Sequence, residues 1–250
     1  MIKRCLVLTL TIALCLIAAT ATADEDWSYT ISPYLWFAGM DGQVSTLPSL
    51  PPADVDASFS DVVGNLDMAL FIAGEVRKGR WGLVADVAYV DLEAEGDTPG
   101  PLYSAVELGA TNWMVSAMGL YRVHDGDGPF VDIVAGFRYW DVSSDLTLRA
   151  GALPELRVDN GESWFDPVIG AKGLSALGES KFSFGWHAIL GGFGAGSDMM
   201  WDLRANFGYQ FGDHTSAILG YRYLDVDYDD DDFLYDITQD GPILGLVWRF

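Results

Sequence analysis

Hydrophobic positions along this chain repeat with a period of two residues. In the 11-residue stretch 201–211, WDLRANFGYQF, every odd position is apolar and every even position is polar or glycine. Strict alternation of this kind predicts a β-strand with two chemically different faces. A strand of about 9–11 residues is also the length that crosses a lipid bilayer when it is tilted.

Nine further segments alternate less strictly, which gives ten predicted strands in all. These segments are 27–37, 68–76, 81–89, 113–121, 131–139, 165–173, 182–190, 219–223 and 241–250. In one of them, 113–121, the polar face is interrupted by Met114, Met118 and Leu120. Proline removes a donor from a hydrogen-bonded ladder. We therefore place Pro167 and Pro242 at strand starts, whereas Pro33 falls inside a predicted strand.

The breaks between these segments alternate between short and long. The short ones are 78–80, 124–128, 178–181 and 212–214. The others are 45–66, 93–104, 147–163 and 227–233, together with a short one at 194–198. Within 45–66, we expect one helical turn over 59–66. An even number of strands with short turns on one rim and long loops on the other is typical of bacterial outer-membrane barrels.

The fold class follows from the chemistry of the bilayer. In hydrocarbon every backbone N–H and C=O must be paired internally, which only a helix or a closed barrel achieves. Beyond the N-terminus no segment is apolar over 18 residues. We therefore expect an all-β fold: a closed antiparallel transmembrane β-barrel of about ten strands. It has short periplasmic turns and longer extracellular loops.

Charged residues on the polar parity are expected to line the barrel lumen, because a charge that faces lipid is costly. They are Asp67, Glu75, Asp86, Asp132, Arg138, Asp166, Lys172, Asp202, Arg204 and Arg222. We favour a salt-bridged interior that fills the lumen, with a narrow polar pore as the alternative. Barrels of eight strands are filled by side chains, whereas those of 16–18 strands leave a channel, so ten strands lie near the filled end.

The N-terminal segment has the features of a secretory signal peptide. Residues 1–23 combine Lys3 and Arg4 with an apolar run and the small residues Ala21 and Ala23. Residues 24–250 are then the barrel domain, which contains no cysteine and so forms no disulfide or thiolate metal site. Loss of Lys3 and Arg4 moves the net charge from −22 to −24. Such a charge argues against a nucleic-acid partner.

The C-terminal segment ends in LGLVWRF. Its residues Leu246, Trp248 and Phe250 resemble the signal that the barrel-assembly machinery recognises in Gram-negative outer-membrane proteins. The stretches ISPYLWFAGMDGQV, GYRYLDVDYDDD and ITQDGPILGLVWRF also resemble a widespread, largely uncharacterised family of outer-membrane β-barrels. This resemblance implies the barrel fold and the cell outer membrane, reached through the periplasm, with membrane lipid and lipopolysaccharide as partners. It brings no activity.

Aromatic residues flank the predicted rims, as the girdle of such a barrel requires. They are Trp27, Tyr29, Trp81, Tyr121, Phe182, Phe211, Trp248 and Phe250.

The predicted extracellular rim is also rich in acidic residues. Segment 225–233, DVDYDDDDF, holds six aspartates. Oxygen clusters suit hard cations, but an EF-hand loop needs glycine where Asp230 stands.

We favour a solvated acidic loop at 225–233. The alternative is weak binding of Mg²⁺ or Ca²⁺ that bridges the acidic loops to lipopolysaccharide phosphates. Other acids predicted at the same rim are Asp54, Asp56, Asp61, Asp91, Glu93, Glu95 and Asp97. We predict neither a cofactor nor a dedicated metal site.

Catalytic motifs are absent from the sequence, which contains neither Gly-x-Ser-x-Gly nor HExxH. Of the three histidines, His124 and His214 fall in short periplasmic turns and His187 faces the lumen. We therefore expect no enzyme. The predicted function is that of a structural barrel or a narrow passive pore for small solutes. The alternatives are a binding or adhesion module that uses the acidic extracellular loops and, less favoured, a lipid-modifying or proteolytic barrel.

Overall fold

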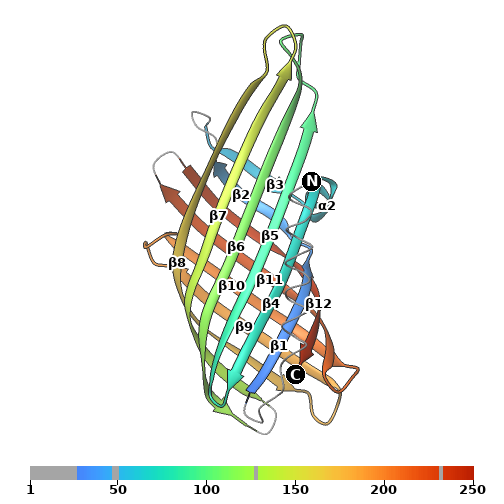
Figure 1. The fold of residues 1–250 in the computed structure, drawn as a ribbon, viewed down its shortest axis with the longest axis vertical. Helices are drawn as coiled ribbons and strands as arrows, with labels where there is room; N and C mark the ends of the chain where they lie inside the picture. Colours follow the sequence, from blue (N-terminus) through green and yellow to red (C-terminus); the bar gives the residue numbers. More distant parts are fainter. Residues whose placement is uncertain (1–26, 47–50, 127–128, 231–232) are drawn as a thin grey trace.

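The computed structural model describes residues 27–46, 51–126, 129–230 and 233–250, and it is a closed antiparallel β-barrel (Figure 1). The wall contains β1 (Trp27–Trp36), β4 (Leu66–Lys78), β5 (Trp81–Gly96), β6 (Tyr103–Asp125), β7 (Phe130–Ala150), β8 (Leu156–Ala176), β9 (Phe182–Gly192), β10 (Met199–Gln210), β11 (Thr215–Asp230) and β12 (Phe233–Arg249). Each pairs with the next, and β1 pairs with β12. The predicted ten-stranded barrel is confirmed, whereas the predicted signal peptide lies outside the described residues.

Three elements of the segment after β1 lie beyond the ten-stranded ring. β2 (Gly39–Ser45) continues the direction of β1 after a bend and pairs with β12, and β3 (Ala53–Ala57) pairs with β2. The expected helical turn is α2 (Phe59–Gly64). Ser58 caps it by accepting a hydrogen bond from the Asp61 amide, and the Asp61 carboxylate accepts one from the Ser58 amide. α2 leads the chain into β4.

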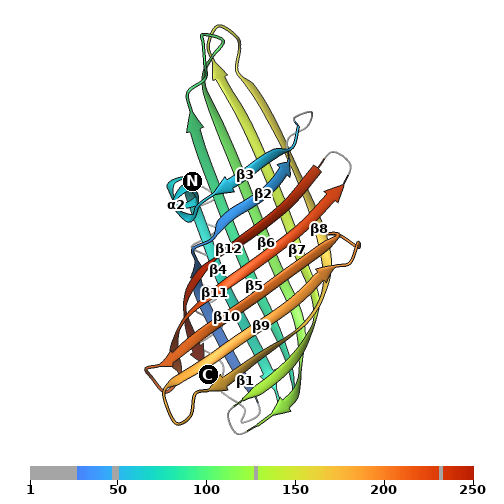
Figure 2. The ribbon, with the colours of Figure 1, turned by 180° about the vertical axis from the view of Figure 1, so that it is seen from behind.

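The strands extend much farther at one end of the barrel than at the other. At one end, the short-turn end, consecutive strands are joined by brief turns such as Gly79-Arg80 and 211–214. At the other, the ribbon end, β5 to β8 rise far above the remaining strands (Figures 1 and 2). The expected long loops at 93–104, 147–163 and 227–233 are wrong in detail. Strand pairing continues to Gly96 and Tyr103, to Ala150 and Leu156, and to Asp230 and Phe233, because cross-strand hydrogen bonds also satisfy the backbone there.

Each of the three prolines within strands lies where pairing on one side of its strand is interrupted. The β1–β12 ladder has pairs at Ile31 and Tyr34 but none at Pro33. Pro242 is paired with β11 at the point where β12 changes its other partner from β1 to β2. Pro167 pairs with β7 just beyond the last β8–β9 pair, at Val168. Placement of Pro167 and Pro242 at strand starts was therefore wrong, and a missing donor is tolerated at these interruptions.

The outer face of the wall is an apolar band. Trp201, Leu203, Phe207 and Tyr209 are all exposed, whereas Arg204 on the opposite parity is largely enclosed. Ring pairs at the short-turn end are Trp81 with Tyr121 and Phe182 with Tyr209. In the described part of the chain, no helix is long and apolar enough to cross a membrane. A closed wall with apolar side chains outside and charges inside is the arrangement that a bilayer requires.

A charge placed in this band should destabilise the protein. Ile169 of β8 is 52% exposed, and its cross-strand neighbours on the same face are Ala135 and Leu190. We expect Ile169→Arg to lower the free energy of unfolding in lipid vesicles by roughly 2–4 kcal/mol, measured by urea titration of tryptophan fluorescence. Leu156→Arg, at the water-exposed ribbon end, is the control and should change it little. Equal effects of both variants would contradict the assignment of the band.

The stability of α2 should depend on pH. The hydrogen bonds from Ser58 lower the pKa of the Asp61 carboxyl below its ordinary value. A lowered folded-state pKa contributes stability above the ordinary value and loses it as the pH falls through the folded one. We therefore expect amide protection in α2 to fall at acidic pH, measured by hydrogen exchange. Ser58→Ala should leave that protection low at every pH tested; unchanged protection would contradict the capping role.

Candidate functional site

Asp202 of β10 is the centre of the buried charge cluster inside the barrel. Its carboxylate is 2.6 Å from Arg138 Nη2 of β7 and 2.7 Å from Arg222 Nη2 of β11. His187 Nε2 of β9 is 3.0 Å away. Asp202 is fully buried and both arginines are nearly so. Since a buried charge is tolerated only when it is paired and hydrogen-bonded, these contacts fix opposite walls of the barrel to each other.

A polar chain extends this cluster to the remaining walls. Arg138 Nε donates to Ser116 Oγ at 2.9 Å, and Arg222 Nη1 donates to the Tyr34 hydroxyl at 3.3 Å. Tyr34 in turn donates to Asp86 at 2.8 Å. The other oxygen of Asp86 lies 3.6 Å from Arg204 Nη2. The chain therefore spans β1, β5, β6, β7, β10 and β11.

A second charge cluster lies nearer the short-turn end. Arg77 contacts Glu75 at 3.0 Å and Asp132 at 2.5 Å. Arg122 lies 2.9 Å from the other oxygen of Asp132, and Lys172 forms an ion pair with Glu75. These contacts join β4, β6, β7 and β8 across the lumen. Charges of both signs therefore occupy the space where an open pore would run.

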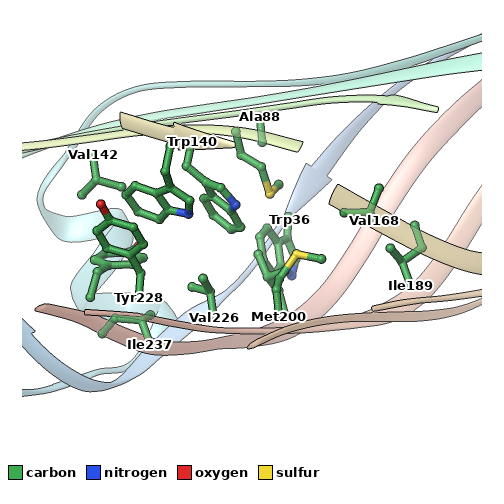
Figure 3. Close-up of a cluster of buried hydrophobic side chains, with 14 of the residues drawn as sticks. Trp36, Ala88, Trp140, Val142, Val168, Ile189, Met200, Val226, Tyr228 and Ile237 are labelled. Atoms are coloured by element: carbon green, nitrogen blue, oxygen red, sulfur yellow. The ribbon is translucent and has the colours of Figure 1, made fainter. Parts of the chain in front are cut away.

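The interior toward the ribbon end is aromatic and tightly buried. Figure 3 shows side chains from opposite walls, including Trp140, Tyr228 and Met200, gathered inside the barrel. Trp164 stacks on Tyr228 with 3.9 Å between ring centroids and lies 5.7 Å from Trp140. Trp140 and Met200 are at most 1% exposed. This aromatic layer closes the cross-section above the charges.

Asp166 ties the aromatic layer to the wall. It accepts hydrogen bonds from Trp140 Nε1 at 2.7 Å and from both the amide and the hydroxyl of Ser197. Trp164 Nε1 donates to the same hydroxyl at 2.9 Å. Asp166 is thus held by neutral donors, and it anchors the rings whose stacking fills the lumen.

Nine of the ten predicted lumen residues meet in these interior contacts. The exception is Asp67, which is exposed near the ribbon end of β4, where the register shifts between Leu66 and Met68. The prediction missed Arg77 and Arg122, although Arg77 shares the parity of Glu75. It also missed the aromatic layer, because Trp140 and Trp164 resemble membrane-facing residues by type. In the assembly signal, Leu246 and Phe250 are exposed, and Phe250 exchanges two backbone hydrogen bonds with Tyr29.

The outer face near the ribbon end carries many carboxylates. In the strand registers Asp227 is directly opposite Asp236, and Asp41 is opposite Asp56. Partial burial and the neighbouring carboxylates raise the pKa of Asp227 above its ordinary value. The described residues contain no group of three or more acids, histidines or cysteines that could hold a metal ion. Two of the six aspartates of 225–233, at positions 231 and 232, lie outside those residues.

Solved structures of outer-membrane proteins share this fold, and two of them match with a TM-score of 0.50. The translocator domain of the autotransporter NalP from Neisseria meningitidis has a TM-score of 0.50 and 10% identity, covering 97% of this chain and 95% of that chain. The outer membrane protease OmpT from Escherichia coli has a TM-score of 0.50 and 13% identity, covering 92% and 98%. No protein-family model and no curated protein sequence matches. At such identities the likeness shows the fold alone, which is that of Gram-negative outer-membrane β-barrels.

Proposed function

We propose that this protein is an integral barrel of the Gram-negative outer membrane with a closed lumen and a structural role. The observation that carries this proposal is the filled cross-section, in which Asp202, Met200 and Trp140 have almost no exposed surface. The apolar band supports insertion into lipid. By analogy with outer-membrane barrels, the short-turn end faces the periplasm and the ribbon end faces outward.

The proposal includes the expected route to the membrane. Residues 1–23 direct secretion to the periplasm, and Leu246, Trp248 and Phe250 are read by the barrel-assembly machinery. Membrane lipid and lipopolysaccharide then surround the apolar band. Membership of the widespread, largely uncharacterised barrel family remains part of this proposal, supported by the three sequence stretches quoted above.

Conductance in planar bilayers tests the closed lumen. We expect the wild-type protein to give no steady open-channel current, because two layers of side chains block the axis. A variant that removes one layer, Trp164→Ala, should show brief openings more often than the matched outer-face variant Trp113→Ala. Steady single-channel steps from the wild type would overturn the closed barrel in favour of the narrow passive pore.

We propose a binding or adhesion role for the ribbon end as the second candidate. Among the described residues, the only basic side chains there are Arg149 and Arg157, and acids compensate both: Glu107 lies 2.5 Å from Arg149 and Asp145 lies 3.7 Å from Arg157. The ribbon end therefore presents a strongly negative surface that suits a cationic partner. Cells that display the barrel should adhere to an immobilised polycation. Adhesion should be reduced by the combined substitutions Asp54→Asn, Asp56→Asn, Asp225→Asn and Asp227→Asn.

We propose no enzymatic role. His187, the one histidine inside the barrel wall among the described residues, contacts Asp202, which two arginines already hold. This arrangement favours a fixed structural contact over proton transfer. Peptide or lipid hydrolysis by the purified barrel that is lost in His187→Gln would overturn this proposal.

A further inference from the structure

Basic side chains form a continuous row around the inner wall near the short-turn end. In the strand registers Lys172 of β8 is opposite His187 of β9, His187 is opposite Arg204 of β10, and Arg204 is opposite Arg222 of β11. We call these four residues the basic row. Arg204 and Arg222 are like charges at directly opposed positions, which destabilise a sheet, so this part of the row needs negative charge nearby.

The acids of the barrel do not fully balance these bases. In and beside the basic row, six permanently charged bases are enclosed: Arg77, Arg122, Arg138, Lys172, Arg204 and Arg222. The enclosed acids are five: Glu75, Asp86, Asp132 and Asp202, which pair with these bases, and Asp166, which is directly opposite Arg138 in the strand register. Asp125, which also contacts Arg122, is 60% exposed at the rim. A surplus of one positive charge therefore remains inside.

Several N–H groups of these bases are unused. Arg204 Nε and Nη2 are buried and make no hydrogen bond with the described residues, and the contact of Nη2 with Asp86 is long at 3.6 Å. Arg77 Nη1 is buried and without a hydrogen bond in the same part of the chain. Arg77 itself is 8% exposed. An unpaired guanidinium donor in an enclosed site is costly, so a ligand that supplied acceptor oxygens would relieve this cost.

The basic row is accessible from one side only. Lys172, His187 and Arg204 keep 24%, 18% and 13% of their side-chain surface exposed. Met200 and Leu224, toward the ribbon end, keep at most 1%. Solvent therefore reaches the row from the short-turn end. β8 and β10 are two strand spacings apart, roughly 10 Å, a gap that the long side chains of Lys172 and Arg204 can bridge around one small ligand.

We propose that the basic row binds a phosphate-type oxyanion that enters from the periplasmic side. A phosphate-type oxyanion matches the sign of the surplus charge and offers several acceptor oxygens to donors on different strands. Arg204 supplies its guanidinium, whose buried Nε and Nη2 are reached when the side chain moves, and Lys172 supplies Nζ, which it shares with Glu75. The phosphate is either free or the monoester headgroup of a lipid, since both present the same oxygens. This binding site goes beyond the structural role proposed above, because a closed barrel needs no ligand.

Isothermal titration calorimetry of the full barrel in a phosphate-free maltoside detergent tests the site. One arm uses inorganic phosphate and the other uses short-chain phosphatidic acid. We expect saturable binding in at least one arm, with affinity at least tenfold lower for Arg204→Gln. Arg157→Gln, at the ribbon end, should bind as the wild type does. Binding in the phosphate arm identifies a free anion, and binding in the lipid arm alone identifies a headgroup.

Heat-modifiable gel migration identifies variants that fold. Should Arg204→Gln fail to fold, Lys172→Gln replaces it with the same expected loss. The proposal is overturned if neither arm shows saturable binding to the wild type, or if a folded Arg204→Gln or Lys172→Gln barrel binds as tightly as the wild type. It is also overturned if chloride at equal concentration displaces the phosphate, because the site would then not select an oxyanion.

Discussion

Replacing Asp202 with alanine is expected to lower the free energy of unfolding by roughly 3–5 kcal/mol, because it removes one partner of a buried ion cluster. Arg138 and Arg222 would remain enclosed, and each would lose its closest carboxylate contact, at 2.6 Å and 2.7 Å. Two like charges would then face each other without compensation. The loss should therefore exceed that of any exposed ion pair, which contributes at most about 1 kcal/mol.

Urea unfolding in lipid vesicles, followed by tryptophan fluorescence, measures this loss. Asp236→Ala is the matched control, since Asp236 is exposed on the outer face of β12 and its removal relieves repulsion from Asp227. We expect the control to remain within about 0.5 kcal/mol of the wild type, as is usual for surface substitutions. A similar midpoint for Asp202→Ala and the wild type would show that the central cluster does not hold the walls together.

The outer face of the barrel was predictable because its composition differs from that of the inner face. In 201–211 the odd positions are apolar and the even ones polar, so a period of two assigns each residue to one face. The structure places Trp201 and Phe207 outward and Asp202 inward accordingly. The same pattern predicted the strand number and the positions of the four short turns. Parity carries this information because the strand backbone alternates whatever its neighbours are.

Parity could not predict an interior that is itself apolar. Met114, Met118 and Leu120 interrupt the polar parity of β6. In the structure all three are buried, with at most 7% of their surface exposed. In the sequence pattern they are an irregularity, yet they belong to the packed lumen. Where both faces of a strand are apolar, alternation no longer separates them. The aromatic layer around Trp140 and Trp164 escaped prediction for this reason.

The contacts inside the barrel depend on the stagger of the strands, which no local pattern encodes. Arg138 and Asp202 meet although 64 positions separate them, and Tyr34 meets Asp86 across 52. Closure requires a fixed shear and tilt, and only these decide which inward residues share a level. The sequence could therefore predict the residues of the lumen, but not the pairs that they form or the basic row.

Replacing Trp164 with alanine is expected to lower the free energy of unfolding by roughly 3–5 kcal/mol, as for other buried tryptophans. Trp164 is 5% exposed, stacks on Tyr228 and donates to Ser197. The same unfolding assay measures the loss. Trp113→Ala, on the outer face beside Tyr89, removes an equal volume and should cost less, because lipid fills the space. Equal losses for the two variants would indicate that the aromatic layer stabilises the barrel no more than a tryptophan on the outer face does. A larger loss for Trp164 places part of the barrel's stability in its filled lumen, which an open channel could not supply.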